Sequence, residues 1–272
     1  FFTKALSDLG VAPKGLREPF KRLFTQGMIR LGGSKMSKSK GNLVSPEAIL
    51  DDQGADALRL AHLQVKPPQE DVDWEDFGID GCAKFLQRVW RLAVPDSDLT
   101  NGARDGDPTE ADAEIDRATH RLVARITNEY DRWSYNTAVA GFMEFTNTLY
   151  RYVQTDEEIH TDTLAAAIDT LLLVMAPAAP HLCAELWDQR NGGHVHVEAW
   201  PEADPEKLVD DTVTMIVQVN GKVRDRVDVP SDIDEDTAVA AARACEKVAV
   251  ALAGAEPRKV IARPPKLVNI VV

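Results

Sequence analysis

The most informative stretch of this chain is KMSKSKGN, at residues 35–42. It packs three lysines, two serines and a glycine into eight residues, and Gly32-Gly33 precedes it. Ser45-Pro46 follows as the expected start of a helix, with Ser45 as N-cap. Lysine ammonium groups and the N–H groups of a helix start both favour anions, so the stretch is predicted to be a mobile loop suited to a polyphosphate. A merely solvated basic turn is the plain alternative.

Composition predicts a folded chain of two or three domains. The 272 residues are 44% hydrophobic, which is enough for more than one core. The formal net charge is -13, from 31 Lys and Arg against 44 Asp and Glu. An acidic surface disfavours DNA binding and non-specific RNA wrapping, so any RNA must bind at local basic patches. No apolar run reaches the roughly 20 residues of a membrane span.

Cysteine usage indicates neither a metal site nor a disulfide framework. Cys82, Cys183 and Cys245 lie far apart and form no CxxC pair. A reducing, cytoplasmic setting fits this pattern best. The chain opens at Phe1 without an initiator methionine, so we expect a piece of a longer protein.

Periodicity predicts a mainly helical chain with a small β-containing end. Apolar residues recur at helical spacing through most of the chain. The expected helices cover residues 3–9, 55–62, 74–92, 115–130, 136–153 and 161–175. Two more helices are expected to start at Pro46 and after Pro180. The acidic segment 96–116 is expected to be a surface excursion.

A hairpin signal opens the last part of the chain. Asn220-Gly221 stands between the β-branched runs 212–219 and 222–229. A helix over 236–252, with Asp234 as a possible cap, and one or two strands within 260–272 should complete a small α+β domain. The predicted domains are therefore 1–68, 69–205 (a helical bundle) and 206–272.

The loop string also resembles a known signature. Residues 35–39 match the KMSKS motif of class I aminoacyl-tRNA synthetases letter for letter. The resemblance implies that residues 1–68 end a Rossmann-type catalytic domain and that the loop closes over ATP. Carried over by position, Lys38 contacts the ATP phosphates and Lys35 supports it as the second catalytic lysine. Met36, Ser37 and Ser39 complete the implied ATP-binding set.

A second string, Gly-Ala-Asp-x-x-Arg at residues 54–59, is similar to the one that follows KMSKS in this family. Read physically, Asp56 stands near a helix start and Arg59 one turn later, as an i,i+3 pair. We expect these residues to hold the platform of the loop rather than to touch substrate.

The rest of the chain resembles bacterial-type leucyl-tRNA synthetases. The resemblance rests on residues 74–78, 85–92, 217–226, 258–261 and 266–272. It implies ATP-dependent activation of leucine, with ATP as its Mg²⁺ complex, transfer to tRNA(Leu), and an anticodon-binding bundle over 69–205. The alternatives are a valyl, isoleucyl or methionyl enzyme, or a standalone tRNA-binding module.

Basic residues near the C-terminus suggest an RNA contact. On one strand, Lys222, Arg224 and Arg226 are two residues apart and should share a face. A three-residue loop 219–221, with Gly221 left-handed, would place Ile216 and Gln218 beside them. A two-residue Asn-Gly turn would place Val217 and Val219 there; burial favours the longer loop. The family resemblance implies that this domain grips folded tRNA. The set that could extend the patch is Arg258, Lys259, Arg263 and Lys266.

Several helix residues have plainer expectations. Arg88 and Arg91 could meet tRNA phosphates, although arginines on helix surfaces are ordinary. His181, at a helix start, is expected to cap or pack. Three tryptophans with apolar neighbours are expected in the core: Trp90, Trp133 and Trp187.

One signature of the family does not occur in the sequence. No His-x-Gly-His string, the other ATP-binding motif of class I enzymes, is present in the 272 residues. No Rossmann half that would hold leucine and adenine is visible either. We therefore expect this chain to need a longer protein around it to make leucyl-adenylate.

Overall fold

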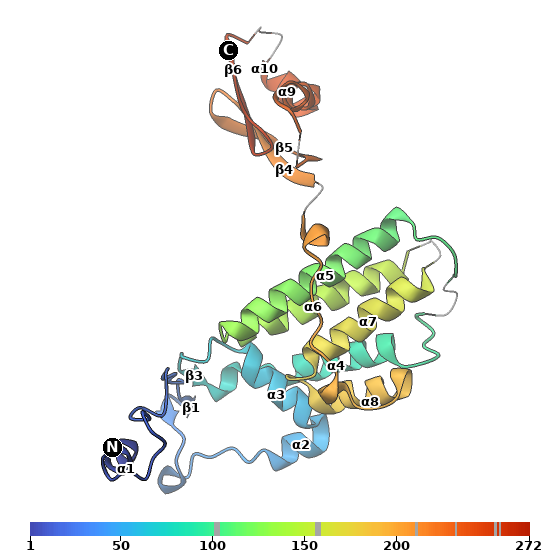
Figure 1. Ribbon diagram of the computed structural model, residues 1–272. Helices are drawn as coiled ribbons and strands as arrows, with labels where there is room; N and C mark the ends of the chain where they lie inside the picture. The colour runs from blue at the N-terminus through green and yellow to red at the C-terminus, as the bar shows by residue number, and fades with distance from the viewer. Residues whose placement is uncertain (101–103, 156–158, 210–211, 232, 253–254, 256) are drawn as a thin grey trace. The chain divides into compact units, whose positions relative to one another are not determined.

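The computed structural model describes residues 1–272 except 101–103, 156–158, 210–211, 232, 253–254 and 256. It divides into two compact units, Phe1–Ala203 and Asp204–Val272, each with its own core (Figure 1). The described residues are mainly helical, as the sequence predicts, with two small sheets; the sequence predicts strands only in the second unit.

A small sheet carries the loop of the first unit. Its strands are β1 (Ile29–Leu31), β2 (Ser34–Lys35) and β3 (Val72–Asp73), in the order β2-β1-β3. Gly32 and Gly33 join β1 to β2 with φ of 58° and 72°, the two-residue hairpin turn that glycine favours. They therefore form the tight turn between the two strands.

Two short helices follow the loop. They are α2 (Glu47–Gln53) and α3 (Ala55–Gln64), separated by Gly54 at φ 83°. The expected start at Pro46 is wrong by one residue, because Pro46 is the N-cap. The hydroxyl oxygen of Ser45 still accepts a long hydrogen bond from the backbone N–H of Glu47, at 3.4 Å.

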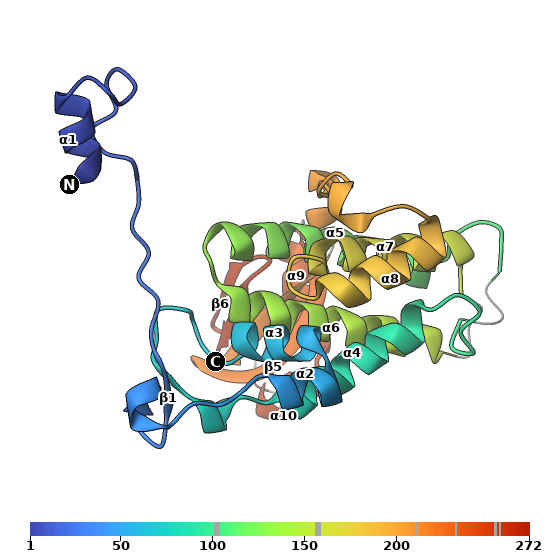
Figure 2. The ribbon, with the colours of Figure 1, turned by 90° about the horizontal axis from the view of Figure 1, so that it is seen from below.

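Five helices form the bundle of the first unit. They are α4 (Ile79–Ala93), α5 (Glu110–Asp131), α6 (Tyr135–Val153), α7 (Thr161–Met175) and α8 (Pro180–Asn191). Helix α3 packs against α4, α6 and α8, so the residues after the loop belong to the same core (Figure 2). The expected helix over 74–92 is interrupted, because a 3₁₀ turn at Trp74–Asp76 precedes α4.

Only one of the three expected core tryptophans is buried. Trp187 is 9% exposed, whereas Trp90 is 37% and Trp133 is 42% exposed. Trp133 has φ 60° in the turn between α5 and α6, and its ring lies 4.4 Å from that of Phe24, centroid to centroid. Helical spacing identified the helix faces, but neighbouring segments decide which parts of a face are covered.

The second unit is a four-stranded sheet with two helices. Its elements are β4 (Thr212–Val219), β5 (Lys222–Pro230), α9 (Glu235–Ala244), α10 (Glu246–Leu252), β6 (Lys259–Arg263) and β7 (Leu267–Val271). The strand order is β5-β4-β7-β6. The single helix expected over 236–252 is wrong, because Cys245 is extended with ψ 126°. This break lets Ala242 of α9 and Val248 of α10 both reach the core over the sheet.

Candidate functional site

The 35–42 stretch is a compact loop at the end of a hairpin. Lys35 ends β2, and residues Lys38–Lys40 form one 3₁₀ turn. The hydroxyl oxygen of Ser37 caps this turn by accepting from the backbone N–H of Lys40 at 3.3 Å. Gly41 ends the turn at φ 67°, in the left-handed region that glycine favours. Ser37 therefore orders the loop.

Hydrogen bonds from Asn42 close the loop. Its side-chain oxygen accepts from the backbone N–H of Ser37 at 2.9 Å. Its amide nitrogen donates to the carbonyl oxygens of Ser34 at 3.4 Å and Lys35 at 3.3 Å. The sequence analysis gave Asn42 no role, although an amide after a left-handed glycine is a common way to bond nearby backbone.

The loop presents cations without protein counter-ions. Lys35, Lys38 and Lys40 are all exposed. Within the described parts of the chain, their ammonium groups form no ion pair or hydrogen bond. Unpaired ammonium groups on an ordered turn can bind phosphate oxygens without first breaking a salt bridge. The predicted ATP-binding residues are thus brought together on one loop, with Met36 and Ser37 half-buried between the exposed lysines.

Acidic residues anchor the hairpin that carries the loop. Nε of Arg30 on β1 lies 3.2 Å from Oδ1 of Asp73 on β3. The backbone N–H of Gly32, at the hairpin turn, donates to Oε1 of Glu75 at 3.2 Å. Gly27 leads into β1 so close to the Glu70 carbonyl that a Cβ would overlap its oxygen. These contacts fix the hairpin against residues about 43 positions later, which no local pattern indicates.

Helix α3 is the platform behind the loop, and its residues Asp56 and Arg59 connect it to the bundle. Asp56, 6% exposed, accepts from the backbone N–H of Leu182 at 2.8 Å, and its other oxygen lies 2.8 Å from Nδ1 of His181. The Arg59 guanidinium donates to the carbonyls of Pro177 at 2.9 Å and Ala178 at 3.1 Å. Together the two side chains supply hydrogen-bond partners for backbone groups between the end of α7 and the start of α8.

This arrangement corrects one expectation and refines another. Asp56 and Arg59 do not pair with each other; both reach a corner more than 110 residues away. His181 is not the cap of α8, because the Asp56 carboxylate takes that role and the His181 side chain is 72% exposed. The expected structural role of the 54–59 string is consistent with these contacts.

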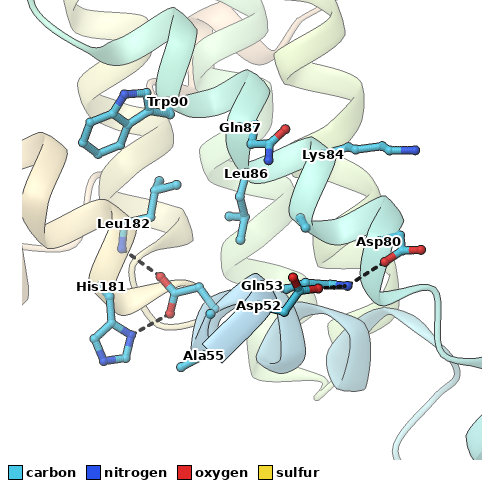
Figure 3. A pocket seen from close by; sticks show the side chains of 13 residues that line it. Asp52, Gln53, Ala55, Asp80, Lys84, Leu86, Gln87, Trp90, His181 and Leu182 are labelled. Atoms are coloured by element: carbon cyan, nitrogen blue, oxygen red, sulfur yellow. Dashed lines mark hydrogen bonds and ion pairs between the residues drawn. The ribbon is translucent and has the colours of Figure 1, made fainter. Parts of the chain in front are cut away.

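A groove of about 780 Å³ lies beside this platform. Helices α2, α3, α4 and α8 line it, and Figure 3 shows Trp90, Lys84, Asp80 and His181 around it. Gln53 donates to Asp80 across it at 2.6 Å. Acidic side chains outnumber cations there, and no lysine of the 35–42 loop contributes to it. The groove is therefore separate from the cationic loop.

The two arginines of α4 have different surroundings. Arg88 donates to Oδ1 of Asn147 at 2.8 Å, and its guanidinium carbon lies 4.6 Å from the ring centre of Tyr150. Arg91 is exposed, and among the described contacts its side chain has no partner. Arg88 therefore joins α4 to α6, whereas Arg91 is open to solvent.

The hairpin of the second unit differs from the expected one. Asn220 and Gly221 both have positive φ, 52° and 76°, and Val219 pairs directly with Lys222. The turn therefore has two residues, and the expected three-residue loop is wrong. The register then shifts between Val217 and Gln218, which leaves Arg224 as the extra residue of a β-bulge.

The bulge separates the three strand cations. Lys222 lies opposite Val219, which is 2% exposed and faces the helices. Arg226 lies opposite Ile216, on the other face, because residues three apart on β4 point to opposite sides. The expectation that Lys222, Arg224 and Arg226 share one face is therefore wrong.

The face turned away from α9 and α10 carries a different set of cations. The paired residues Arg226, Ile216, Leu267 and Arg263 form one row across all four strands. Lys259 lies on the same face, two residues before Ile261 and four before Arg263. Arg258, directly before β6, and Lys266, directly before β7, are exposed. We call the face with Arg226, Lys259 and Arg263 the open face.

Family comparisons cover both units. Residues 2–75 match the family described as tRNA synthetases class I (I, L, M and V). Residues 112–239 match the family described as anticodon-binding domain of tRNA ligase. The leucine–tRNA ligase of Symbiobacterium thermophilum is 41% identical over 308 aligned residues, which cover 100% of this chain and 35% of that protein. The chain is thus similar to a leucine–tRNA ligase over its whole length.

A second curated relative and a solved structure are similar to the chain over nearly its whole length. The leucine–tRNA ligase of Lawsonia intracellularis is 39% identical, over 100% of this chain and 34% of its own length. A solved ternary complex of Agrobacterium radiobacter K84 agnB2 LeuRS with tRNA and LeuAMS matches 99% of this chain and 35% of that one, with 29% identity and a TM-score of 0.79. The chain thus spans about a third of the length of the leucine–tRNA ligases it matches.

These matches confirm the resemblance expected from the sequence. The class I match contains the whole 35–42 loop and its hairpin. The anticodon-binding match begins at Asp112 in α5 and continues into the second unit. No helix among the described residues is long and apolar enough to cross a membrane.

Proposed function

We propose that this chain supplies the nucleotide loop and tRNA-binding units of a leucine–tRNA ligase, which activates leucine with ATP and transfers it to tRNA(Leu). The observation that carries the proposal is the ordered KMSKS loop with unpaired lysines, in a chain that is about 40% identical to such ligases over its whole length. Its three parts are taken as the catalytic-domain end 1–68, the bundle 69–205 and the C-terminal domain 206–272.

The proposed chemistry assigns the loop to the phosphates of ATP. The leucine carboxylate attacks the α-phosphorus, and pyrophosphate leaves. Negative charge grows on the phosphoryl oxygens as this happens, so an ammonium group held in place stabilises the transition state more than the ground state. Lys38 is assigned to this contact and Lys35 supports it. Met36, Ser37 and Ser39 hold the shape of the loop around the nucleotide.

ATP enters this scheme as its Mg²⁺ complex, which is a substrate. The described residues contain no group of three or more His, Cys, Asp or Glu side chains that could hold a metal ion. The proposal therefore assigns no residue of this chain to the ion. Leucine and the adenine ring are assigned to parts of the ligase other than this chain.

The open face of the second unit is the proposed tRNA contact. Arg226, Lys259 and Arg263 are exposed on it, with the apolar side chains of Ile216 and Leu267 between the two arginines. Cations spread around a shallow apolar centre suit a folded RNA that is recognised by backbone and shape. Arg258 and Lys266 extend this surface; Lys222, Arg224, Arg88 and Arg91 are assigned as outlying contacts.

The first test is amino-acid-dependent ATP–pyrophosphate exchange by the full-length ligase that contains this chain. Leucine, isoleucine, valine and methionine are offered separately. Leucine should give the dominant signal, with kcat/KM exceeding that for valine by at least about 10-fold to 200-fold, the range for one methylene. Dominance of another amino acid would point to a different aliphatic synthetase. Absence of exchange with all four would favour a tRNA-binding module without this chemistry.

The second test concerns the open face. Replacing Arg226, Lys259 and Arg263 with glutamine should weaken tRNA binding and reduce its salt dependence, by about one unit of log–log slope for each lost phosphate contact. Arg243→Gln is the matched control, since Arg243 is exposed on α9 of the same unit but not on the sheet. An unchanged slope in the triple variant would leave the open face without a role in binding tRNA.

A further inference from the structure

Asn42 occupies a special place in the nucleotide loop. Within the described residues, its three hydrogen bonds are the contacts that join residues 34–37 to the chain beyond Gly41. The remaining bonds of the loop are local, between Ser37 and Lys40, Ser37 and Ser39, or Lys38 and Gly41. Without Asn42, no hydrogen bond among the described residues would join residues 34–37 to the chain beyond Gly41.

The orientation of the Asn42 amide follows from its partners. The oxygen faces the N–H of Ser37, which donates, and the nitrogen faces two carbonyl oxygens, which accept. Turning the amide over would set donor against donor and acceptor against acceptor. Both hydrogens of the amide nitrogen are thus directed at backbone, so the side chain is placed to hold the loop rather than to bind a substrate.

The bonds of Asn42 lie beside the two lysines assigned to ATP. One holds the carbonyl of Lys35, and another holds the N–H of Ser37, the residue before Lys38. The backbone on both sides of Met36 is therefore fixed by the same side chain. The lysine side chains themselves remain exposed and unpaired among the described contacts. The backbone from which the two lysine side chains extend is ordered, while their ammonium groups stay available to bind phosphate oxygens.

We propose that Asn42 is a positioning residue that sets the places from which Lys35 and Lys38 reach the ATP phosphates. This proposal rests on the function proposed above. A transition-state contact depends steeply on position, so a loop that is free to spread loses rate even when its lysines are intact. Asn42 acts through the lysines and contacts neither ATP nor leucine.

The chemistry of the side chain provides matched variants. Asn42→Ala removes all three bonds. Asn42→Asp keeps the size and the oxygen that accepts from Ser37, but it loses both donors and sets a carboxylate oxygen against two carbonyl oxygens. Both variants should behave alike if the donors are needed. Because Asn42 lies at the surface of a loop and is only half-buried, neither change should lower the unfolding temperature measurably.

The test measures leucine-dependent ATP–pyrophosphate exchange in the full-length ligase with Asn42→Ala, Lys38→Ala and the double variant. We expect Asn42→Ala to lower kcat by about 10-fold to 100-fold with the KM for leucine unchanged, as displacement of a catalytic group does. In the Lys38→Ala background the same change should cost clearly less than in the wild type, because the part of its effect that passes through Lys38 is already lost and only the part through Lys35 remains. Trypsin cleavage at the loop lysines should also become about 5-fold faster in Asn42→Ala without nucleotide, since a held loop is protected.

The outcomes separate this proposal from the function on which it rests. Full activity of Asn42→Ala in a ligase that exchanges with leucine would overturn the positioning role alone. So would an undiminished effect of the change in the Lys38→Ala background, which would show that Asn42 acts independently of Lys38. A wild-type ligase that shows no exchange with leucine would instead remove the proposed function, and the positioning role with it.

Discussion

Lys38→Ala in the full-length ligase should lower leucine-dependent ATP–pyrophosphate exchange by about 100-fold to 1,000-fold, the cost of removing one preorganised charge donor. Lys38 starts the 3₁₀ turn that Ser37 caps, and its ammonium group has no partner among the described residues. No counter-ion among the described residues therefore has to rearrange when an anion binds to Lys38. The loss should appear in kcat, because in the proposed mechanism the charge that Lys38 stabilises develops only as pyrophosphate leaves.

Two comparisons make the Lys38 result specific. Lys38→Met keeps most of the side-chain length and removes the charge, so it should be as slow as Lys38→Ala. Lys14→Ala removes another exposed lysine, outside the loop, and should leave exchange unchanged. Transfer RNA affinity should hardly change in any of the three, since the proposed tRNA surface lies elsewhere. Exchange at the wild-type rate in Lys38→Met would exclude Lys38 from the chemistry.

Asp112→Ala should destabilise the protein by about 3 to 5 kcal/mol, the cost of removing one partner of a buried charged network. Asp112 is 1% exposed and stands in the first turn of α5. Its carboxylate accepts from the Arg104 guanidinium at 2.6 Å, from the Thr109 N–H at 2.6 Å and from the Tyr152 hydroxyl. The alanine variant leaves all of these donors without the acceptor they share. Urea unfolding at pH 7 measures the loss.

The stabilisation that Asp112 provides should depend on pH. Burial raises the pKa of Asp112, but hydrogen bonds from Tyr152 and Thr109, with the charge of Arg104, outweigh it and lower the pKa from 3.8 to about 2. Burial and the bond to Asp112 raise the pKa of Tyr152 to about 12, so its hydroxyl stays a donor. Since the folded pKa of Asp112 is depressed, its stabilisation is complete above pH 3.8 and is lost as pH falls through about 2.

Asp112→Asn isolates this effect. The difference in unfolding free energy between wild type and Asp112→Asn should be constant above about pH 4. It should shrink by about 2 kcal/mol between pH 4 and pH 2, because 1 unit of pKa corresponds to about 1.4 kcal/mol. Other carboxylates titrate in both proteins and cancel in the difference. A difference that stays constant down to pH 2 would contradict a depressed pKa at Asp112.

Local sequence patterns predicted most of the helices and strands. The predicted bounds of α7 and β4 agree with the structure, because apolar periodicity and β-branched runs are local properties. The break at Cys245 was not predictable in this way, since no proline or glycine marks it. The sequence permits one long helix there, and packing of Ala242 and Val248 over the sheet selects two.

For the candidate site, too, some features could be predicted from the sequence and others needed the structure. The lysines and serines of the loop could be assigned from the sequence, because their chemistry depends on residue type. The role of Asn42 depends on three backbone groups that a turn brings within hydrogen-bond distance. Asp56 and Arg59 could be singled out by pattern, but their partners at the α7–α8 corner lie more than 110 residues away.

Residue type and short spacings were enough to predict the resemblance to leucyl-tRNA synthetases, most helical and β-hairpin elements and the cationic chemistry of the loop. Only the tertiary structure decided which side chains share a surface. A single bulge at Arg224 moved Lys222 and Arg226 to opposite faces of the sheet, and strand order then placed Arg226 in one row with Arg263. Strand register is set by pairing with distant segments, and a shift of one residue turns every later side chain to the other face.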